Sequence, residues 1–396
     1  MSTPQHPINS GFTADSTIGE VVEGVDLTGK LAIVTGGYSG IGTAVTRGLS
    51  DAGATVVVPA RHPDQARKVI GGVAGVEIAE LDLADLGSVE RFVGDFLASD
   101  RGVDMLINNA AVMANELTRV GPDGWESQFA IDHLGHFALT NRLWPALARG
   151  GGARVVSVSS RGHKFSGIRW DDMHWARGYD KWQAYGHAKT ANVLFAVALD
   201  ARGKDTGVRA LAVYPAGVRT PLQRHLTHRE MRDLGWYDDL GNLAPLFKTP
   251  EQGAAGEAWA ATSPRLDGMG GVYIERCDIA EIADPGTDKG KQEGVNPVAV
   301  DPGQAERLWA VSAQLTGVDA TAIRRRRSWR PSGGRSASTI RPWRTCTGSR
   351  KPTHCRSSPR PAPRKSLTAS GSCSTPGPPS PPSSSAVTAT CSPPTA

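Results

Sequence analysis

Residues 31–42 read LAIVTGGYSGIG, and this stretch decides the fold. The run begins with four apolar residues, which is typical of a strand buried on both faces of a sheet. Its glycines then give the spacing G-x-x-x-G-x-G before a helical pattern. Three glycines can mark an ordinary loop, but at a strand-to-helix turn they let a pyrophosphate approach the backbone at the helix N-terminus. The residues expected to hold a dinucleotide here are Gly36, Ser39, Gly40, Ile41 and Gly42.

Apolar runs and helical patterns alternate along the rest of residues 25–318. The expected strands are 31–37, 54–60, 76–83, 103–109, 153–159, 208–215 and 271–275. The expected helices include 40–52, 85–99, 123–148, 180–203 and 250–262. This alternation, with right-handed crossovers, predicts an α/β fold: a single Rossmann-type doubly wound parallel sheet with helices on both faces. Ligands bind such sheets at the carboxyl ends of the strands.

Composition divides the chain of 396 residues near residue 319. Residues 321–396 hold 14 of the 44 Lys and Arg and 13 of the 27 Pro, but no Asp or Glu. We therefore expect an N-terminal extension (1–24), a domain (25–318) and a disordered Arg-, Pro- and Ser-rich tail (319–396). The tail is either natural or an out-of-frame translation of GC-rich DNA, which would also lose its acidic residues. Only this basic tail suggests a nucleic-acid partner, and we expect none.

The remaining composition narrows the class of protein. The chain is 39% hydrophobic and 21% charged, as in soluble α/β proteins, and contains no apolar run long enough to span a membrane. The N-terminus lacks the basic start and apolar core of a secretory signal, so a cytoplasmic location is expected. Cys277 is the one cysteine in residues 1–320, and the tail cysteines lack CxxC spacing. Neither disulfides nor a metal site are expected.

The end of the second expected strand bears on the choice of cofactor. Arg61 stands 19 residues after Gly42, where enzymes that prefer NAD usually carry an acid for the ribose 2′-hydroxyl. A guanidinium instead suits the 2′-phosphate of NADP. Asp64 is a rival for the NAD role, but His62-Pro63-Asp64 is also typical of a helix start. We expect NADP, with NAD as the less favoured alternative.

Two further motifs, added to T-G-x-x-x-G-I-G, resemble the short-chain dehydrogenase/reductase family. They are Leu81-Asp82-Leu83 and Asn108-Asn109-Ala110-Ala111, the second of which reads N-N-A-G in the family. The resemblance implies that Asp82 holds the adenine amino group, with Leu83 in the same cofactor site, and that Asn109 and Ala110 line the adenine ribose. Without the family, the two asparagines could simply satisfy backbone groups at a strand end.

Residues 185–189 read YGHAK, the Y-x-x-x-K signature of that family. A spacing of four places Tyr185 and Lys189 on one face of a helix. Free tyrosine has a pKa of about 10, and a nearby ammonium and an oxidised nicotinamide both lower it. The resemblance implies that Tyr185 is the acid in carbonyl reduction and the base in alcohol oxidation, while Lys189 also bonds the nicotinamide ribose.

The resemblance adds two more residues to the catalytic set. The expected strand 153–159 leads into Ser159-Ser160, where the family carries a serine that donates a hydrogen bond to the substrate oxygen. The family pattern favours Ser160, with Ser159 as the alternative. Asp132 stands where the family motif N-H-L-G-H-F has an asparagine that helps to place a water between the lysine and solvent. The charge of Asp132 would hold Lys189 protonated and oppose formation of tyrosinate.

Later segments supply the nicotinamide loop and the substrate lid. Residues 215–220 read PAGVRT and match P-G-x-V-x-T with Ala216 in place of the glycine, which implies that Pro215, Val218 and Thr220 lie at the nicotinamide. Residues 161–184 resemble the retinol dehydrogenase and WW-domain oxidoreductase branch. The three tryptophans of this insert either face substrate or pack over the domain edge (Trp170, Trp175 and Trp182). Residues 221–249 correspond to the family's variable lid.

The sequence thus predicts an NADP-dependent oxidoreductase that acts on the CH–OH or carbonyl group of a small molecule. A homo-oligomer is possible, because the family often assembles through two of its helices, although this branch includes exceptions. The alternative is a catalytically weak dinucleotide-binding sensor or scaffold, which Asp132 and the N-N-A-A motif suggest.

Overall fold

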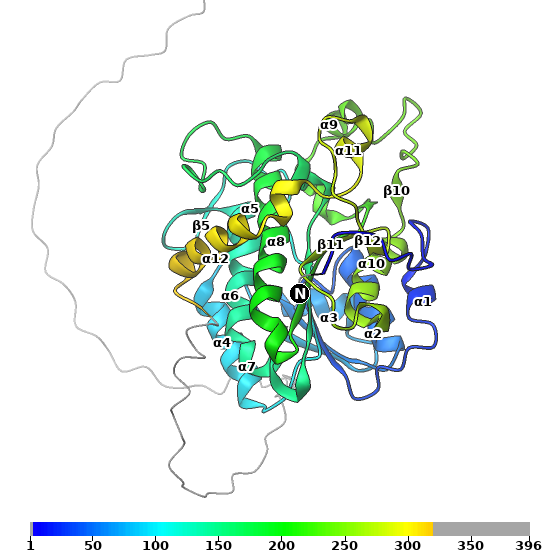
Figure 1. Cartoon of the computed structure of the whole chain (residues 1–396), viewed down its shortest axis with the longest axis vertical. Helices are drawn as coiled ribbons and strands as arrows, with labels where there is room; N and C mark the ends of the chain where they lie inside the picture. The colour runs from blue at the N-terminus through cyan, green and yellow to red at the C-terminus, as the bar shows by residue number, and fades with distance from the viewer. Residues whose placement is uncertain (1–2, 320–396) are drawn as a thin grey trace, which may run out of the picture. The chain divides into compact units, whose positions relative to one another are not determined.

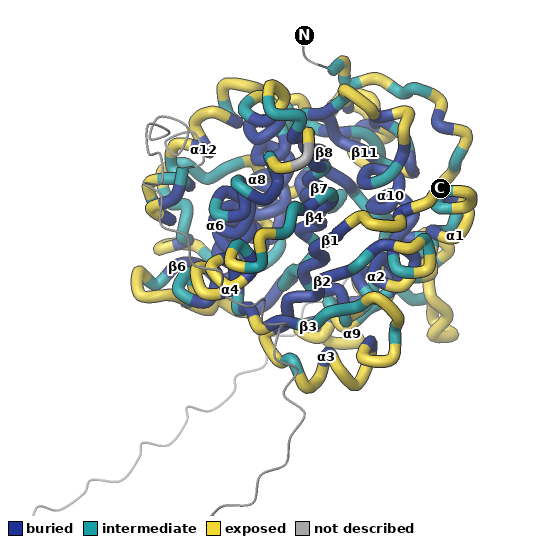
Figure 2. The backbone as a smooth tube through the Cα atoms, turned by 90° about the horizontal axis from the view of Figure 1, so that it is seen from below, coloured by how far each residue is buried: buried dark blue, intermediate teal, exposed yellow. Residues whose placement is uncertain are grey.

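The computed structural model describes residues 3–319, and the expected tail lies outside them. One eight-stranded sheet lies between two groups of helices (Figure 1). Its strand order is β12-β11-β8-β7-β4-β1-β2-β3, most of which can be followed in Figure 2. Its strands are β1 (Leu31–Val34), β2 (Thr55–Ala60), β3 (Val76–Glu80), β4 (Met105–Asn108), β7 (Arg154–Val158), β8 (Arg209–Tyr214), β11 (Val272–Glu275) and β12 (Asp278–Ile279). All neighbours are parallel except β11 and β12. The predicted fold is confirmed, and the antiparallel edge strand β12 is an addition to it.

Helices cover both faces of this sheet (Figure 2). One face carries α1 (Ile18–Val21), α2 (Ile41–Asp51), α3 (Pro63–Ile70) and α10 (Pro250–Thr262). The other carries α4 (Leu86–Ala98), α6 (Gly135–Arg142), α8 (Lys181–Gly203) and α12 (Pro302–Thr316). In β1, Ile33 packs toward the second face, whereas Ala32 and Val34 pack toward the first. Burial on both sides explains why the strands are apolar throughout.

The single helix expected over 123–148 is wrong. The structure has β6 (Trp125–Glu126), α5 (Ser127–Phe129), a π-helical turn η1 (Ala130–Leu134), α6 and α7 (Trp144–Leu147). The Glu126 carboxylate ends the strand and starts the helix by accepting hydrogen bonds from the backbone N–H groups of Gln128 and Phe129. The π-turn carries Asp132. Such turns often occur at functional sites.

Both ends of the described chain pack against the sheet-and-helix body. In the expected N-terminal extension, Gln5 exchanges hydrogen bonds with the backbone of Tyr273 in β11, and Ile18 joins the core beneath α2 and α10. At the other end, α12 places Trp309 against Phe137 and Phe195, with ring centroids 4.9 and 6.1 Å away. Among residues 3–319, no helix combines the length and apolar character needed to cross a bilayer.

Candidate active site

The glycine turn after β1 leaves room for a ligand at the start of α2. A Cβ atom on Gly42 would lie 2.6 Å from the side-chain nitrogen of Asn109 and would also collide with the carbonyl oxygen of Gly36. Gly40 is the N-cap of α2 with φ of 54°, and no described side chain caps the helix. The first N–H groups of α2 are therefore available to an anion, which the helix dipole also favours.

Thr35 ties this turn to the end of β4. Its Oγ1 accepts hydrogen bonds from the backbone N–H groups of Asn109 and Ala110 at 2.9 and 3.0 Å. The Asn109 side chain donates back to the Thr35 carbonyl at 2.8 Å. A Cβ atom on Gly36 would lie 3.0 Å from the Cα of Ala110, so the two segments touch. Thr35 was not among the expected site residues, because its hydrogen bonds to the end of β4 depend on the register between β1 and β4.

Tyr185 and Lys189 lie on α8, which begins where the Asp180 carboxylate accepts hydrogen bonds from the next turn. Both side chains are buried, and Lys189 Nζ lies 5.5 Å from the centre of the Tyr185 ring. Burial raises the pKa of Tyr185 above its ordinary value, whereas the Lys189 charge and a hydrogen bond with the Ser160 side chain act to lower it. The phenol is therefore protonated unless a further positive charge approaches.

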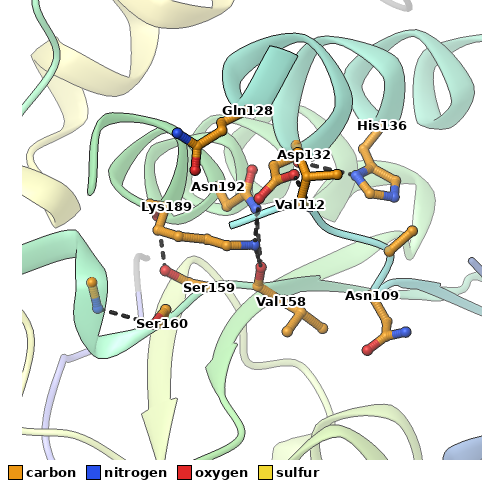
Figure 3. A network of polar contacts seen from close by, with 12 residues as sticks. Asn109, Val112, Gln128, Asp132, His136, Val158, Ser159, Ser160, Lys189 and Asn192 are labelled. Carbon is orange, nitrogen blue, oxygen red and sulfur yellow. Dashed lines mark hydrogen bonds and ion pairs between the residues drawn. The ribbon is translucent and has the colours of Figure 1, made fainter. Parts of the chain in front are cut away.

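The two serines after β7 have different surroundings (Figure 3). Ser159 is buried and donates its hydroxyl hydrogen to the carbonyl oxygen of Lys189 at 2.8 Å. Ser160 accepts a hydrogen bond from the Gly162 N–H at 3.0 Å. A Cβ atom on Gly162 would lie 3.3 Å from the Ser160 hydroxyl oxygen and 2.7 Å from the Tyr185 ring, so both side chains adjoin this glycine. The geometry therefore brings Ser160, and not Ser159, to the phenol.

Asp132 contacts Lys189 directly. Its Oδ2 lies 3.1 Å from Lys189 Nζ, and its Oδ1 accepts a hydrogen bond from the Val112 N–H at 2.8 Å (Figure 3). Burial is the largest single influence and acts to lower the pKa of Lys189, but the combined attraction of Asp132, Tyr185 and Glu257 outweighs it, so the pKa is raised. The Val158 carbonyl receives hydrogen bonds from Lys189 Nζ at 3.3 Å and from the Asn192 side chain at 3.0 Å. Asn192, three residues beyond Lys189, was missed in the sequence.

The residues after β2 and β3 line the other end of the same edge. Arg61 is exposed, and its Nε donates to the His62 ring at 3.3 Å. Asp64, the rival for an NAD-type role, forms an ion pair with Arg67 within α3. Asp82 uses Oδ1 to accept the Ala84 N–H at 2.9 Å. Its other carboxylate oxygen remains available to a ligand.

The loop after β8 returns to the glycine turn. A Cβ atom on Gly40 would lie 2.9 Å from Thr220 Cγ2, so these distant segments are in contact. Val218 is buried and packs close to Gly253 of α10. Pro215 is half-buried. Ala216 has φ of 87°, a backbone conformation that favours the glycine of the family motif.

An apolar cluster surrounds Tyr185 on the lid side. Its buried members are Met113, Ala114, Tyr185, Leu226 and Met231. Trp182 of the insert and Trp236 of the lid pack against the cluster, and their rings meet edge to face with centroids 6.1 Å apart.

The other two tryptophans of the insert do not join this cluster. Trp170 donates to Gln304 of α12 at 3.0 Å, and Trp175 is buried with the Arg169 guanidinium over its ring. Both pack over the domain, which leaves Trp182 as the insert's tryptophan beside Tyr185.

The sequence of this chain is similar to those of known dehydrogenases and oxidoreductases. The family model for short chain dehydrogenase matches residues 30–231. A probable oxidoreductase of Streptomyces lividans is 42% identical over 298 residues, which cover 73% of this chain and 98% of that protein. Human retinol dehydrogenase 14 is 34% identical over 311 residues, which cover 73% of this chain and 87% of the relative.

Solved structures show the same fold. The crystal structure of a protein from Mycobacterium Paratuberculosis has a TM-score of 0.59 and 32% identity, and the match covers 77% of this chain and 98% of the other. A 3-ketoacyl-(acyl-carrier-protein) reductase from Brucella melitensis, complexed with NADH, has a TM-score of 0.50 and 23% identity over 63% of this chain and 97% of the other.

Proposed function

Because the chain belongs to the short-chain dehydrogenase family, in its retinol dehydrogenase-like branch, we propose that it transfers a hydride between NADP(H) and an alcohol or carbonyl substrate. Membership makes it an oxidoreductase that uses a nicotinamide dinucleotide. The observation that carries the finer proposal is the position of Tyr185 at the carboxyl edge of the sheet. Its ring adjoins Gly162 together with the Ser160 hydroxyl, and Lys189 Nζ lies 5.5 Å from the ring centre.

The residues at this edge fit a dinucleotide. The uncapped start of α2 suits a pyrophosphate. Arg61 suits the 2′-phosphate of NADP, and the ion pair of Asp64 with Arg67 removes the nearest carboxylate from competition. The remaining binding set comprises Ser39, Asp82, Leu83, Asn109, Ala110, Pro215, Val218 and Thr220. NAD is kept as the alternative, since a solved relative carries NADH.

Each catalytic side chain then has a defined task. The bound nicotinamide supplies or accepts the hydride. Tyr185 donates its proton to the carbonyl oxygen during reduction and takes a proton from the alcohol during oxidation. Ser160 donates a hydrogen bond to the same oxygen, and the Lys189 charge opposes the rise that burial causes in the pKa of Tyr185.

Turnover tests this assignment. NADPH consumption with a panel of aldehydes and ketones should be measured for the wild-type protein and for Tyr185→Phe. The variant keeps the ring but loses the proton donor, so turnover should fall by about a hundredfold or more while NADPH still binds. Wild-type protein that binds NADPH but reduces no carbonyl supports the sensor or scaffold alternative, which the Lys189–Asp132 ion pair favours.

The compartment is part of the same proposal. Cys277, the only cysteine in residues 1–320, is buried and free, and a fold that uses no disulfide suits a reducing compartment such as the cytoplasm. Cell fractionation followed by immunodetection tests this location.

A further inference from the structure

A large cavity adjoins the loop after β8, and Pro215 is the one residue of the assigned cofactor and catalytic set that lines it. Its volume is about 1010 Å³, at the upper end of the range for ligand pockets. One wall begins at Arg161, directly after Ser160, and continues through Tyr214–Ala216. The opposite wall comes from residues 275–294, and residues 12–15 of the N-terminal segment close the side. The cavity thus extends to the residue that follows Ser160.

The charges around this cavity largely compensate one another within the protein. Six carboxyl groups and four basic side chains line it, an excess of acid that disfavours an anionic ligand. At the rim, Arg276 pairs with Glu293 at 2.8 Å and Lys248 pairs with Asp15 at 2.6 Å. The Asp278 carboxylate accepts the backbone N–H groups of residues 8 and 10. Charge attraction therefore selects neither an anion nor a strong cation.

Three polar side chains gather at the end of the cavity nearest Ser160. Tyr214 and Glu275 are register partners on the parallel strands β8 and β11, so their side chains lie on the same face of the sheet. Arg161 is held nearby by a hydrogen bond to Gln292 at 3.0 Å. Burial raises the pKa of both Tyr214 and Glu275. The phenol remains protonated, and the carboxyl group is drawn toward its neutral form.

The Tyr214 hydroxyl lacks a hydrogen-bond partner among residues 3–319, although Tyr214 is half-buried. Glu275 uses one oxygen to accept the Gly294 N–H at 2.8 Å, and Arg161 uses one nitrogen for Gln292. Each of the three groups therefore has hydrogen-bonding capacity left for a molecule in the cavity. Water or a hydroxyl group of a ligand can fill these positions.

We propose that this cavity is a subsite for the part of the substrate remote from the reacting carbon, and that it takes a neutral, hydroxyl-rich group such as a sugar ring. The inference rests on the proposed function, since the reacting carbonyl must lie at Ser160 and Tyr185. Tyr214 and Glu275 exchange hydrogen bonds with the hydroxyl groups of the ligand, and Arg161 donates to one of their oxygens.

A matched pair of ketones tests this subsite. The probes are para-hydroxyacetophenone and its O-β-glucoside, which differ by the sugar alone. For wild-type protein, kcat/KM should be higher for the glucoside. Tyr214→Phe should lower the ratio of the two kcat/KM values by about three- to tenfold, as expected for loss of one neutral hydrogen bond. Ser99→Ala removes a hydroxyl at the end of α4, outside the cavity and the lid, and should leave the ratio unchanged.

The outcomes separate the two proposals. If neither ketone is reduced, the proposed function fails. If both are reduced and Tyr214→Phe leaves their ratio within twofold of wild type, the subsite is wrong while the proposed function stands. Preference for an ammonium-bearing analogue over the glucoside would overturn the neutral ligand class. Melting curves of both variants confirm that the comparison is made on folded protein.

Discussion

Lys189 Nζ lies 3.1 Å from Asp132 Oδ2, and both side chains are almost completely buried. Asp132 reaches this position because the π-turn η1 directs it toward α8 and because its second oxygen is fixed by the Val112 N–H. The pair places a negative charge next to the cation that should assist deprotonation of Tyr185. The protein therefore has a built-in resistance to tyrosinate formation.

Replacing Asp132 by asparagine tests this resistance. The amide side chain introduced by Asp132→Asn keeps an acceptor for the Val112 N–H but removes the charge, so the pKa of Tyr185 should fall. One pKa unit corresponds to about 1.4 kcal/mol. The pH at which alcohol oxidation sets in should move lower by about one unit, while NADPH affinity remains nearly unchanged.

The measurement is the rate of alcohol oxidation against pH for both proteins. Breaking a buried ion pair also costs stability, so melting temperatures are recorded in parallel. Superimposable pH profiles from two folded proteins would show that the Asp132 charge does not act on Tyr185.

Cofactor preference depends on Arg61. Arg61→Ala should weaken NADPH binding by about ten- to a hundredfold, because a charge-assisted hydrogen bond contributes roughly 1.5–3 kcal/mol. NADH lacks the 2′-phosphate, so its affinity should barely change. Lys68→Ala is the matched control, since it removes another exposed positive charge from α3 and leaves the ion pair of Asp64 with Arg67 intact. Fluorescence titrations that show equal losses for both cofactors would contradict this role of Arg61.

The lid rests on the first turn of α8 through two contacts. Lys181 forms an ion pair with Glu230, and the Trp182 and Trp236 rings meet edge to face at 6.1 Å. Trp236→Ala should loosen the lid, so KM for carbonyl substrates should rise about tenfold and proteases should cut residues 221–249 faster. Leu240→Ala, at an 87% exposed position of the same segment, is the control. Equal proteolysis of Trp236→Ala and wild type would show that the ring contact does not hold the lid.

The strands and the glycine turn were predictable because their signals are local. Residues 31–34 are all apolar because this strand is buried on both faces of the sheet. The glycines of G-x-x-x-G-x-G are needed for the tight turn that follows the strand. The π-turn was not predictable, because long-range contacts select its backbone: Asp132 with Lys189, and His136 with Thr35 at 2.9 Å.

The site shows the same division. The spacing of Tyr185 and Lys189 follows from one helix and was readable in the sequence. Tyr214 and Glu275 lie side by side on two strands that are far apart in the chain, so no local sequence pattern predicts their proximity. Ala216 illustrates the reverse case, since its departure from the family glycine is visible in sequence but its positive φ appears only in the fold.

The positive φ of Ala216 predicts that glycine is more stable than alanine at this position. An alanine with φ of 87° carries a cost that glycine lacks. Ala216→Gly should raise the free energy of unfolding by up to about 1 kcal/mol. The larger conformational entropy of glycine in the unfolded chain offsets part of this gain. Urea denaturation of the two proteins measures the difference. A clear loss of stability in Ala216→Gly would show that the alanine methyl group contributes packing that outweighs the strain.

A buried carboxyl group on α10 gives the protein a pH-dependent stability. Glu257 is fully buried, and neither of its oxygens has a hydrogen-bond partner among the described residues. Burial raises its pKa to about 8, although the Lys189 charge acts in the opposite direction. The folded protein therefore keeps this proton up to about pH 8, whereas the unfolded chain releases it near the ordinary value of 4.5.

Between those two values the unfolded state binds fewer protons than the folded state, so stability falls as pH rises, by at most about 1.4 kcal/mol per pH unit. Glu257→Gln has no proton to release and should lose this dependence. Its stability gain over wild type should be small at pH 5 and largest at pH 8. Taking the difference between the two proteins cancels the buried histidines, whose lowered pKa values act mainly below pH 6.5. Glu281→Gln, at an exposed position, is the control and should follow wild type at every pH. The measurement is urea unfolding of all three proteins at pH 5, 6.5 and 8. If the stability difference between Glu257→Gln and wild type does not grow with pH, Glu257 is already ionised in the folded state.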